Sequence, residues 1–172
     1  MKKTIALLLT VIMLLSFVGC RRSVKYENVT YRESGIEFTL PSSMRRSYVE
    51  GYDYYFSTLA IIFTAVKIDS EFIESSEIDL DPSISAKEYV DLITEEMDKS
   101  QMYFNVDESR NLYNFRYTYE DQSSGTEIFY YVIVIGESGN TWYIEMCCDQ
   151  QDSGTFVETF DEWKMSIKTY NS

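Results

Sequence analysis

Residues 111–148, NLYNFRYTYEDQSSGTEIFYYVIVIGESGNTWYIEMCC, decide the fold, because they read as three consecutive strands joined by short turns. Residues 111–120 alternate between two faces, whereas residues 127–135 are apolar at both alternating positions. A strand that is apolar on both faces is typical of a central strand covered on both sides. Both connections contain glycine, as tight hairpins require. The stretch therefore predicts an antiparallel meander whose middle strand is buried on both faces and whose last strand covers residues 142–148.

Further strands are expected on either side of this meander. Period-two alternation of Ile36, Phe38 and Leu40 predicts the second strand of a hairpin with residues 29–31, which ends at Pro41 because proline has no N–H to donate. The other expected strands are residues 52–56, 59–66 and 103–106. Residues 42–47 are expected to form one helical turn, and residues 67–84 an acidic loop.

Two helices are predicted from capping patterns and helical spacing. Ser85 and Glu88 form a capping box, and the apolar stripe behind it comprises Ala86, Tyr89, Val90, Ile93 and Met97. Thr155 and Glu158 have the same spacing before a helix whose inward side chains would be Phe156, Phe160, Trp163 and Ile167. The element order predicts an α+β fold over residues 28–172, with helices packed on an antiparallel sheet.

The N-terminus has the pattern of an export signal. Lys2 and Lys3 precede an apolar run at 5–18, which is shorter than the roughly 20 residues of a membrane-spanning helix. The run ends in Phe17-Val18-Gly19-Cys20, which resembles the lipobox of bacterial lipoproteins, with Phe17 in place of the usual aliphatic residue. The resemblance implies a signal peptide at 1–19 and a lipidated tether at 20–27. It also implies diacylation of Cys20, with palmitate-type chains, and attachment to the extracytoplasmic face of the cell membrane. The alternative is an uncleaved signal anchor.

Composition excludes several classes of function. Removing Lys2 and Lys3, two positive charges, would lower the formal net charge from −13 to −15. Nucleic acid is not an expected partner, because phosphate binding needs Lys and Arg. The sequence has no histidine, so imidazole-based catalysis and most zinc and iron sites are excluded. No phosphate-binding glycine motif is present, and no cofactor or metal is expected.

Three groups of side chains are candidates for a site. The tyrosines of residues 48–55 combine apolar area with a polar tip, which suits recognition of a partner; they are Tyr48, Tyr52, Tyr54 and Tyr55. A competing interpretation places them in the core, as is expected for Tyr113, Tyr117 and Tyr119.

The acidic segment could offer oxygen ligands to calcium, but it lacks the order of a calcium loop; its acidic residues are Asp69, Glu71, Glu74, Glu77, Asp79 and Asp81. Cys147 and Cys148 should point to opposite faces of one strand as core thiols.

The order of these elements resembles the PsbP-like fold. The strand ending at 36–41, the Ser-capped helix after a loop, and the last hairpin followed by the helix of Phe160 and Trp163 carry the resemblance. That fold is shared by a photosystem extrinsic protein, a Ran-binding import factor and many bacterial lipoproteins. The resemblance implies an α/β/α sandwich and does not specify a function.

These observations predict a non-enzymatic, membrane-tethered interaction module that binds a protein of the cell envelope. A carrier of a small ligand or of calcium is the second hypothesis. A carboxylate-based hydrolase is the third, and it would need two carboxylates facing each other in a cleft.

Overall fold

The computed structural model describes residues 27–76, 80–95, 97–121, 124–137 and 139–170. The expected signal peptide, Cys20 and most of the expected tether lie outside these residues. Among the helices of the described residues, none is both long enough and apolar enough to cross a membrane. Glu77 and Asp79 of the acidic segment also lie outside the described residues.

A seven-stranded antiparallel sheet runs through the middle of the fold, in the order β3-β4-β5-β9-β8-β7-β6. A second sheet of three strands, in the order β1-β2-β10, is separate from it. The strands of the large sheet are β3 (Arg45–Ser47), β4 (Tyr54–Ser57), β5 (Ile61–Ile68), β6 (Tyr103–Asp107), β7 (Leu112–Asp121), β8 (Thr126–Ile135) and β9 (Thr141–Asp149). Those of the small sheet are β1 (Asn28–Glu33), β2 (Ile36–Pro41) and β10 (Lys168–Thr169).

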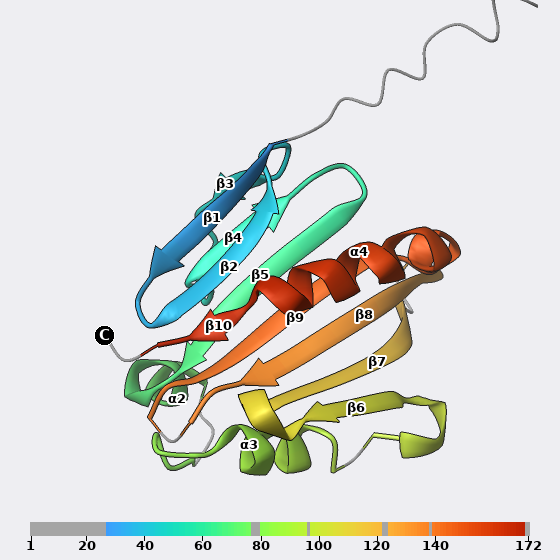
Figure 1. Cartoon of the computed structure of the whole chain (residues 1–172). Helices are drawn as coiled ribbons and strands as arrows, with labels where there is room; N and C mark the ends of the chain where they lie inside the picture. Colours follow the sequence, from blue (N-terminus) through green and yellow to red (C-terminus); the bar gives the residue numbers. More distant parts are fainter. Residues whose placement is uncertain (1–26, 77–79, 96, 122–123, 138, 171–172) are drawn as a thin grey trace, which may run out of the picture.

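The large sheet is covered on both faces (Figure 1). One face packs against the small sheet and the helix α4 (Ser153–Ser166), and this larger core includes Phe38, Phe63, Trp142 and Phe160. The other face packs against α2 (Ser70–Ser76) and α3 (Ala86–Ile93). Strands β5, β9 and β8 contribute side chains to both cores, so they are the central strands of the sheet, and the prediction that β8 is covered on both faces is confirmed. The α+β class and the antiparallel meander are confirmed.

Both expected helices form, with some differences at their ends. The capping box at α3 is present: the Ser85 hydroxyl accepts from the Glu88 N–H, and the Glu88 carboxylate accepts from the Ser85 N–H. That helix ends at Ile93, short of Met97. Helix α4 begins at Ser153, directly after a 3₁₀ turn at Gln150–Asp152. The second capping box is therefore wrong, because Thr155 already lies inside the helix. The inward stripe of α4 is confirmed: Phe160, Trp163 and Ile167 are buried and Phe156 packs against the same core.

Two expectations about the connections are wrong. Residues 45–47 form strand β3 rather than a helical turn, since they pair with β4 at the border of the large sheet. The acidic segment contains helix α2, whose first turn is stabilised by a hydrogen bond from the Phe72 N–H to Asp69 Oδ1. The apolar residues interleaved in that segment explain the helix, because Phe72 and Leu80 pack against the second core.

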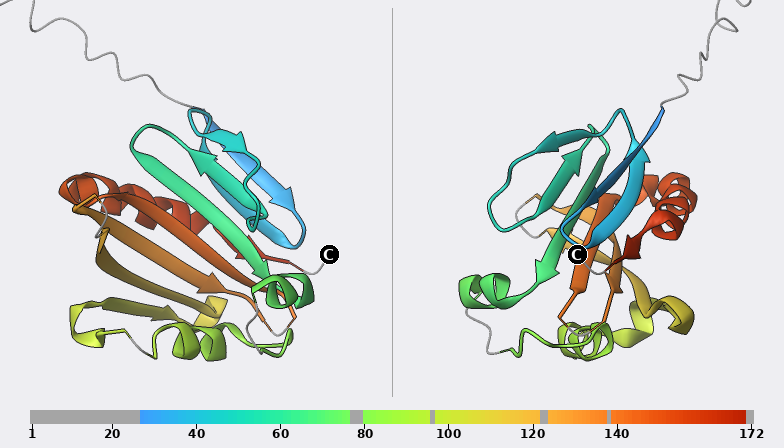
Figure 2. Two further views of the ribbon diagram at one scale, coloured as in Figure 1. Left: turned by 180° about the vertical axis from the view of Figure 1, so that it is seen from behind. Right: turned by 60° about the vertical axis from the view of Figure 1, so that its left-hand side comes forward.

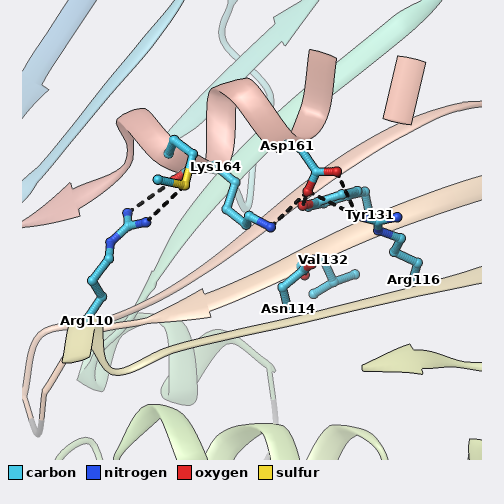
Figure 3. Close-up of polar contacts among 8 residues, drawn as sticks. Arg110, Asn114, Arg116, Tyr131, Val132, Asp161 and Lys164 are labelled. Atoms are coloured by element: carbon cyan, nitrogen blue, oxygen red, sulfur yellow. Dashed lines mark hydrogen bonds and ion pairs between the residues drawn. The ribbon is translucent and has the colours of Figure 1, made fainter. Parts of the chain in front are cut away.

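A cluster of charges holds α4 on the large sheet (Figure 3). The carboxylate of Asp161 accepts from Tyr131 Oη at 2.6 Å, Arg116 Nη2 at 2.9 Å and Lys164 Nζ at 2.8 Å. Burial raises the pKa of the Asp161 carboxyl, but the hydrogen bonds from Lys164 and Tyr131 outweigh this effect and hold the pKa below its usual value. At the C-terminal end of the helix Arg110 donates to the main-chain carbonyls of Lys164 and Ile167.

We predict that Asp161→Asn lowers the free energy of unfolding at pH 7 by about 1–3 kcal/mol, because Arg116 and Lys164 would stay largely buried without their counter-charge. Chemical denaturation measures this change. The matched control is Asp91→Asn, which breaks the exposed Lys87–Asp91 pair and should change the free energy of unfolding far less. Equal losses in the two variants would show that the cluster adds no more than a surface ion pair.

Candidate binding site

The strand β9 places one acidic side chain, Glu145, in the middle of the large sheet. Tyr143 and Cys147 lie on the same face of β9, because side chains two apart along a strand point the same way. The register puts Glu145 opposite Thr64 of β5 and Val132 of β8. These cross-strand pairs fix the neighbours of the carboxylate on both sides.

Glu145 is half-buried and has no cationic neighbour within hydrogen-bonding reach. Among the described residues, Tyr143 alone donates a hydrogen bond to it, from Oη to Oε2 at 2.8 Å, and no Lys or Arg forms an ion pair with it. Burial raises the pKa of the Glu145 carboxyl, and the Tyr143 hydrogen bond only partly offsets this rise. The site therefore holds a carboxylate that is costly to ionise in the absence of a cation.

Three more tyrosines lie near the carboxylate: Tyr52, Tyr117 and Tyr130. The pKa of each phenol is raised, first by burial and then by the charge of Glu145. The rings of Tyr117 and Tyr130 are stacked, with centroids 5.0 Å apart and planes 10° apart. Burial also raises the pKa of the Cys147 thiol to about 12. The phenols and the thiol are therefore neutral at physiological pH, which leaves Glu145 as the one group of this site that can carry a charge there.

Thr64 adds an unsatisfied polar atom beside Glu145. The side chain is 4% exposed, and its Oγ1 has no hydrogen-bond partner among the described residues. A buried hydroxyl without a partner costs free energy. We use the name Glu145 site for Glu145, Thr64, Cys147 and the four tyrosines Tyr52, Tyr117, Tyr130 and Tyr143.

Helices cover this face of the sheet incompletely. Viewed from behind, α2 lies at the end of β5, while α3 lies beside β7 and β8 (Figure 2, left). Side chains farther from these helices, such as Ile62, Tyr130 and Cys147, are half-buried rather than buried. A hollow of about 170 Å³ lies at the edge of α3 and is lined by Tyr89, Ile93, Met97, Phe115, Tyr117 and Tyr143. Two tyrosines of the Glu145 site are therefore also walls of a small cavity.

The structure divides the predicted tyrosine group between two faces. Tyr48 is 91% exposed, and it lines a hollow of about 550 Å³ together with Tyr52, which is 40% exposed. Tyr55 is half-buried, with its ring centroid 6.1 Å from that of Tyr52. The expectation that Tyr54 belongs to a recognition surface is wrong, and the competing core interpretation holds for it. Tyr54 is 3% exposed, belongs to the larger core, and donates to the Glu33 carbonyl. Alternation along β4 turns Tyr54 inward and Tyr55 to the opposite face.

The hollow beside Tyr48 and Tyr52 is acidic. Its lining includes Glu50, Asp53, Asp69 and Glu71, with Lys67 as the one cation among the described residues that line it. Two of these carboxylates are bound to the main chain, since Asp53 accepts from the Lys67 N–H at 2.7 Å and Asp69 caps α2. No three acidic, Cys or His side chains of the described residues come together as a metal site.

Sequence reasoning missed Glu145, although one signal was available. The strand 142–148 is otherwise apolar or aromatic, and a lone carboxylate among such residues is unusual. Tyr119 was expected in the core and is 55% exposed instead, while Tyr113 and Tyr117 pack against the second core as partly buried side chains. Cys147 and Cys148 are free thiols on opposite faces, as the alternation predicts.

We predict that Glu145→Gln raises the melting temperature of the unliganded protein at pH 7.5. A carboxyl whose pKa is higher in the folded than in the unfolded state loses stability as pH rises between these two values. The gain in melting temperature should therefore be larger at pH 7.5 than at pH 4, with about 2–4 °C for each kcal/mol. Thermal melts at the two pH values measure it, with Glu158→Gln on the exposed face of α4 as control. A variant that melts below the wild type at pH 7.5 would contradict the prediction.

Comparison with known proteins identifies the fold. No family model and no curated protein matches the sequence. Among solved structures, the cyanobacterial PsbP protein CyanoP of Synechocystis is similar, with a TM-score of 0.51 at 14% sequence identity. The match covers 88% of this chain and 98% of the CyanoP chain. The Ran-binding protein Mog1p of Saccharomyces cerevisiae is similar with a TM-score of 0.50 at 8% identity, covering 84% and 96% of the two chains.

A protein of Bacteroides thetaiotaomicron is similar with a TM-score of 0.53 at 10% identity, and the match covers 87% of this chain but 50% of that protein. At these identities the likeness establishes the fold alone. The chain has the PsbP-like α+β fold.

Proposed function

We propose that this chain is a lipoprotein held to the extracytoplasmic face of a membrane through Cys20, where it acts as a non-enzymatic module that binds an envelope protein. The observation that carries the proposal is the exposure of Tyr48 and Tyr52 beside a hollow of about 550 Å³. Exposed aromatic side chains at the rim of a cavity are typical of recognition surfaces.

Two further observations support a binding role rather than catalysis. The Glu145 site has a single carboxylate among phenols and a thiol, whereas acid–base hydrolysis needs two groups with separated pKa values. The fold is shared with Mog1p, which is named as a Ran-binding protein. That name concerns the yeast protein, and it supports here only the idea that the fold can serve as an interaction module.

A carrier of a small ligand is the second candidate function. The cavity of about 170 Å³ at the edge of α3 favours it, because Tyr143 joins that cavity to the Glu145 carboxylate. Small-molecule sites commonly combine an apolar lining with a few polar groups that fix orientation. The two candidates differ in whether a protein partner is recovered from cells.

We expect the membrane-extracted protein to begin at Cys20 and to carry acyl chains on that residue, because two chains hold a protein firmly on a bilayer. Mass spectrometry of the intact protein measures the modification. The variant Cys20→Ala should leave the membrane fraction. Recovery of a protein with an unmodified Cys20 would contradict lipid anchoring.

We expect crosslinking in cells to join the full-length protein to one envelope protein, and the double variant Tyr48→Ala, Tyr52→Ala to lose this product. The matched control is Tyr103→Ala, because Tyr103 is also exposed but lies on β6 at the opposite border of the large sheet. Circular dichroism should confirm that all variants are folded. An unchanged product in the double variant would remove the tyrosine surface from the proposal, and recovery of the lipoprotein alone would favour the carrier.

A further inference from the structure

We infer that the Glu145 site binds an organic ammonium group, with the Glu145 carboxylate and the Thr64 hydroxyl as acceptors and the surrounding tyrosine rings as its walls. This inference rests on the proposed function and deepens it, since it gives the chemical class of the group that is recognised. Four features of the site support it: an uncompensated charge, aromatic surroundings, a second free acceptor and an adjoining cavity.

The charge of the ligand follows from the state of Glu145. Asp161, another partly buried carboxylate, is compensated by Arg116 and Lys164. Glu145 has only the Tyr143 hydroxyl, although it lies in the middle of the large sheet between Thr64 and Val132. A cation placed beside it would supply the missing counter-charge and remove the cost of ionising the carboxylate.

The aromatic surroundings favour an ammonium ion over a metal ion. Tyrosine rings attract organic cations through their negative faces, and a carboxylate within such a ring of aromatics is a recurring arrangement for alkylammonium ligands. Metal ions instead need several oxygen, nitrogen or sulfur ligands, and no cluster of three acidic or Cys side chains occurs in the described parts of the chain. The tyrosine hydroxyls remain uncharged, so Glu145 is the one group of the site that can attract the cation as an anion.

Hydrogen bonding favours an ammonium over a guanidinium group. Oε2 of Glu145 already accepts from Tyr143, whereas a guanidinium pairs best when both oxygens of a carboxylate are free. An ammonium donates in three directions from one point. One N–H can reach Glu145 and another can reach Oγ1 of Thr64, which has no partner among the described residues and stands directly opposite in the register.

The cavity at the edge of α3 provides room for the carbon chain of the ligand. Tyr117 and Tyr143 belong both to the Glu145 site and to its lining, and the remaining walls are Tyr89, Ile93, Met97 and Phe115. A volume of about 170 Å³ equals that of about five or six liquid waters, which is enough for a short alkyl chain. The site is therefore suited to a primary alkylammonium, either a free amine or the end of a lysine side chain.

The test is calorimetric titration of the purified protein with butylammonium chloride at pH 7.5, and with 1-butanol as the neutral analogue. We expect butylammonium to bind and 1-butanol to bind at least about tenfold more weakly, because the charge supplies the main attraction. Failure of butylammonium to bind, or equal binding of the two, would overturn the inference. A titration of this kind does not depend on whether crosslinking identifies an envelope partner, so the two proposals can fail separately.

Two isosteric variants locate the binding. Glu145→Gln should weaken butylammonium binding at least about tenfold, and Thr64→Val about threefold to tenfold, while Glu158→Gln should leave it unchanged. Binding to the wild type should also weaken as the pH is lowered and Glu145 takes up a proton, and the Gln variant should lose this dependence. The groups that face Glu145, which are Tyr52, Tyr117, Tyr130, Tyr143 and Cys147, stay protonated as the pH is lowered. A Glu145→Gln variant that binds like the wild type would overturn the assignment.

The source of the ammonium group is distinguished by a second titrant, a short peptide with one central lysine flanked by glycine and serine. Binding of the peptide at least about tenfold tighter than butylammonium would identify a lysine of a partner protein. Binding of butylammonium at equal or higher affinity would identify a free amine. Both results support recognition of an ammonium group, provided that each is lost in the Glu145→Gln variant.

Discussion

Strand β9 is the element on which the other parts of the structure depend, because it pairs along its whole length with β5 on one side and β8 on the other. Residues 61–68 and 128–135 are far apart in the sequence, and β9 joins them into one sheet. The three strands are apolar enough to be covered on both faces, which requires a layer of structure on each side. The small sheet and α4 supply one layer, and α2 and α3 supply the other.

The two layers are unequal, and the inequality creates the candidate site. The small sheet and α4 bury one face of β9, so that Trp142, Ile144 and Met146 are fully enclosed. The short helices α2 and α3 cover only part of the opposite face, where Tyr143, Glu145 and Cys147 alternate with those core residues. A carboxylate in this position lowers the stability of the unliganded fold. Such a cost is common where a protein keeps a binding group in place.

The contrast between Asp161 and Glu145 shows how this protein treats charges in its interior. Asp161 receives three donors, and its carboxyl has a pKa below the usual value although burial acts against ionisation. Glu145 receives one donor from a neutral phenol, and burial determines its raised pKa. In the first arrangement the carboxylate has its counter-charges without a ligand, and the cluster stabilises the packing of α4. The second leaves acceptor capacity free, which is why it is the place where a cation would bind.

The sequence by itself determined the local elements, because period-two alternation, capping residues and turn glycines act over a few neighbouring positions. The meander, the α3 cap, the inward stripe of α4 and the opposite directions of Cys147 and Cys148 could all be predicted in this way. The order of the strands, the separate small sheet and strand β10 depended on pairing between distant segments, which alternation does not encode. For the same reason only the tertiary structure decided that Tyr54 is core while Tyr48 is exposed, and that Glu145 has no cationic partner within the described parts of the chain. Alternation tells which residues share a face, but coverage by other layers decides which part of that face stays open.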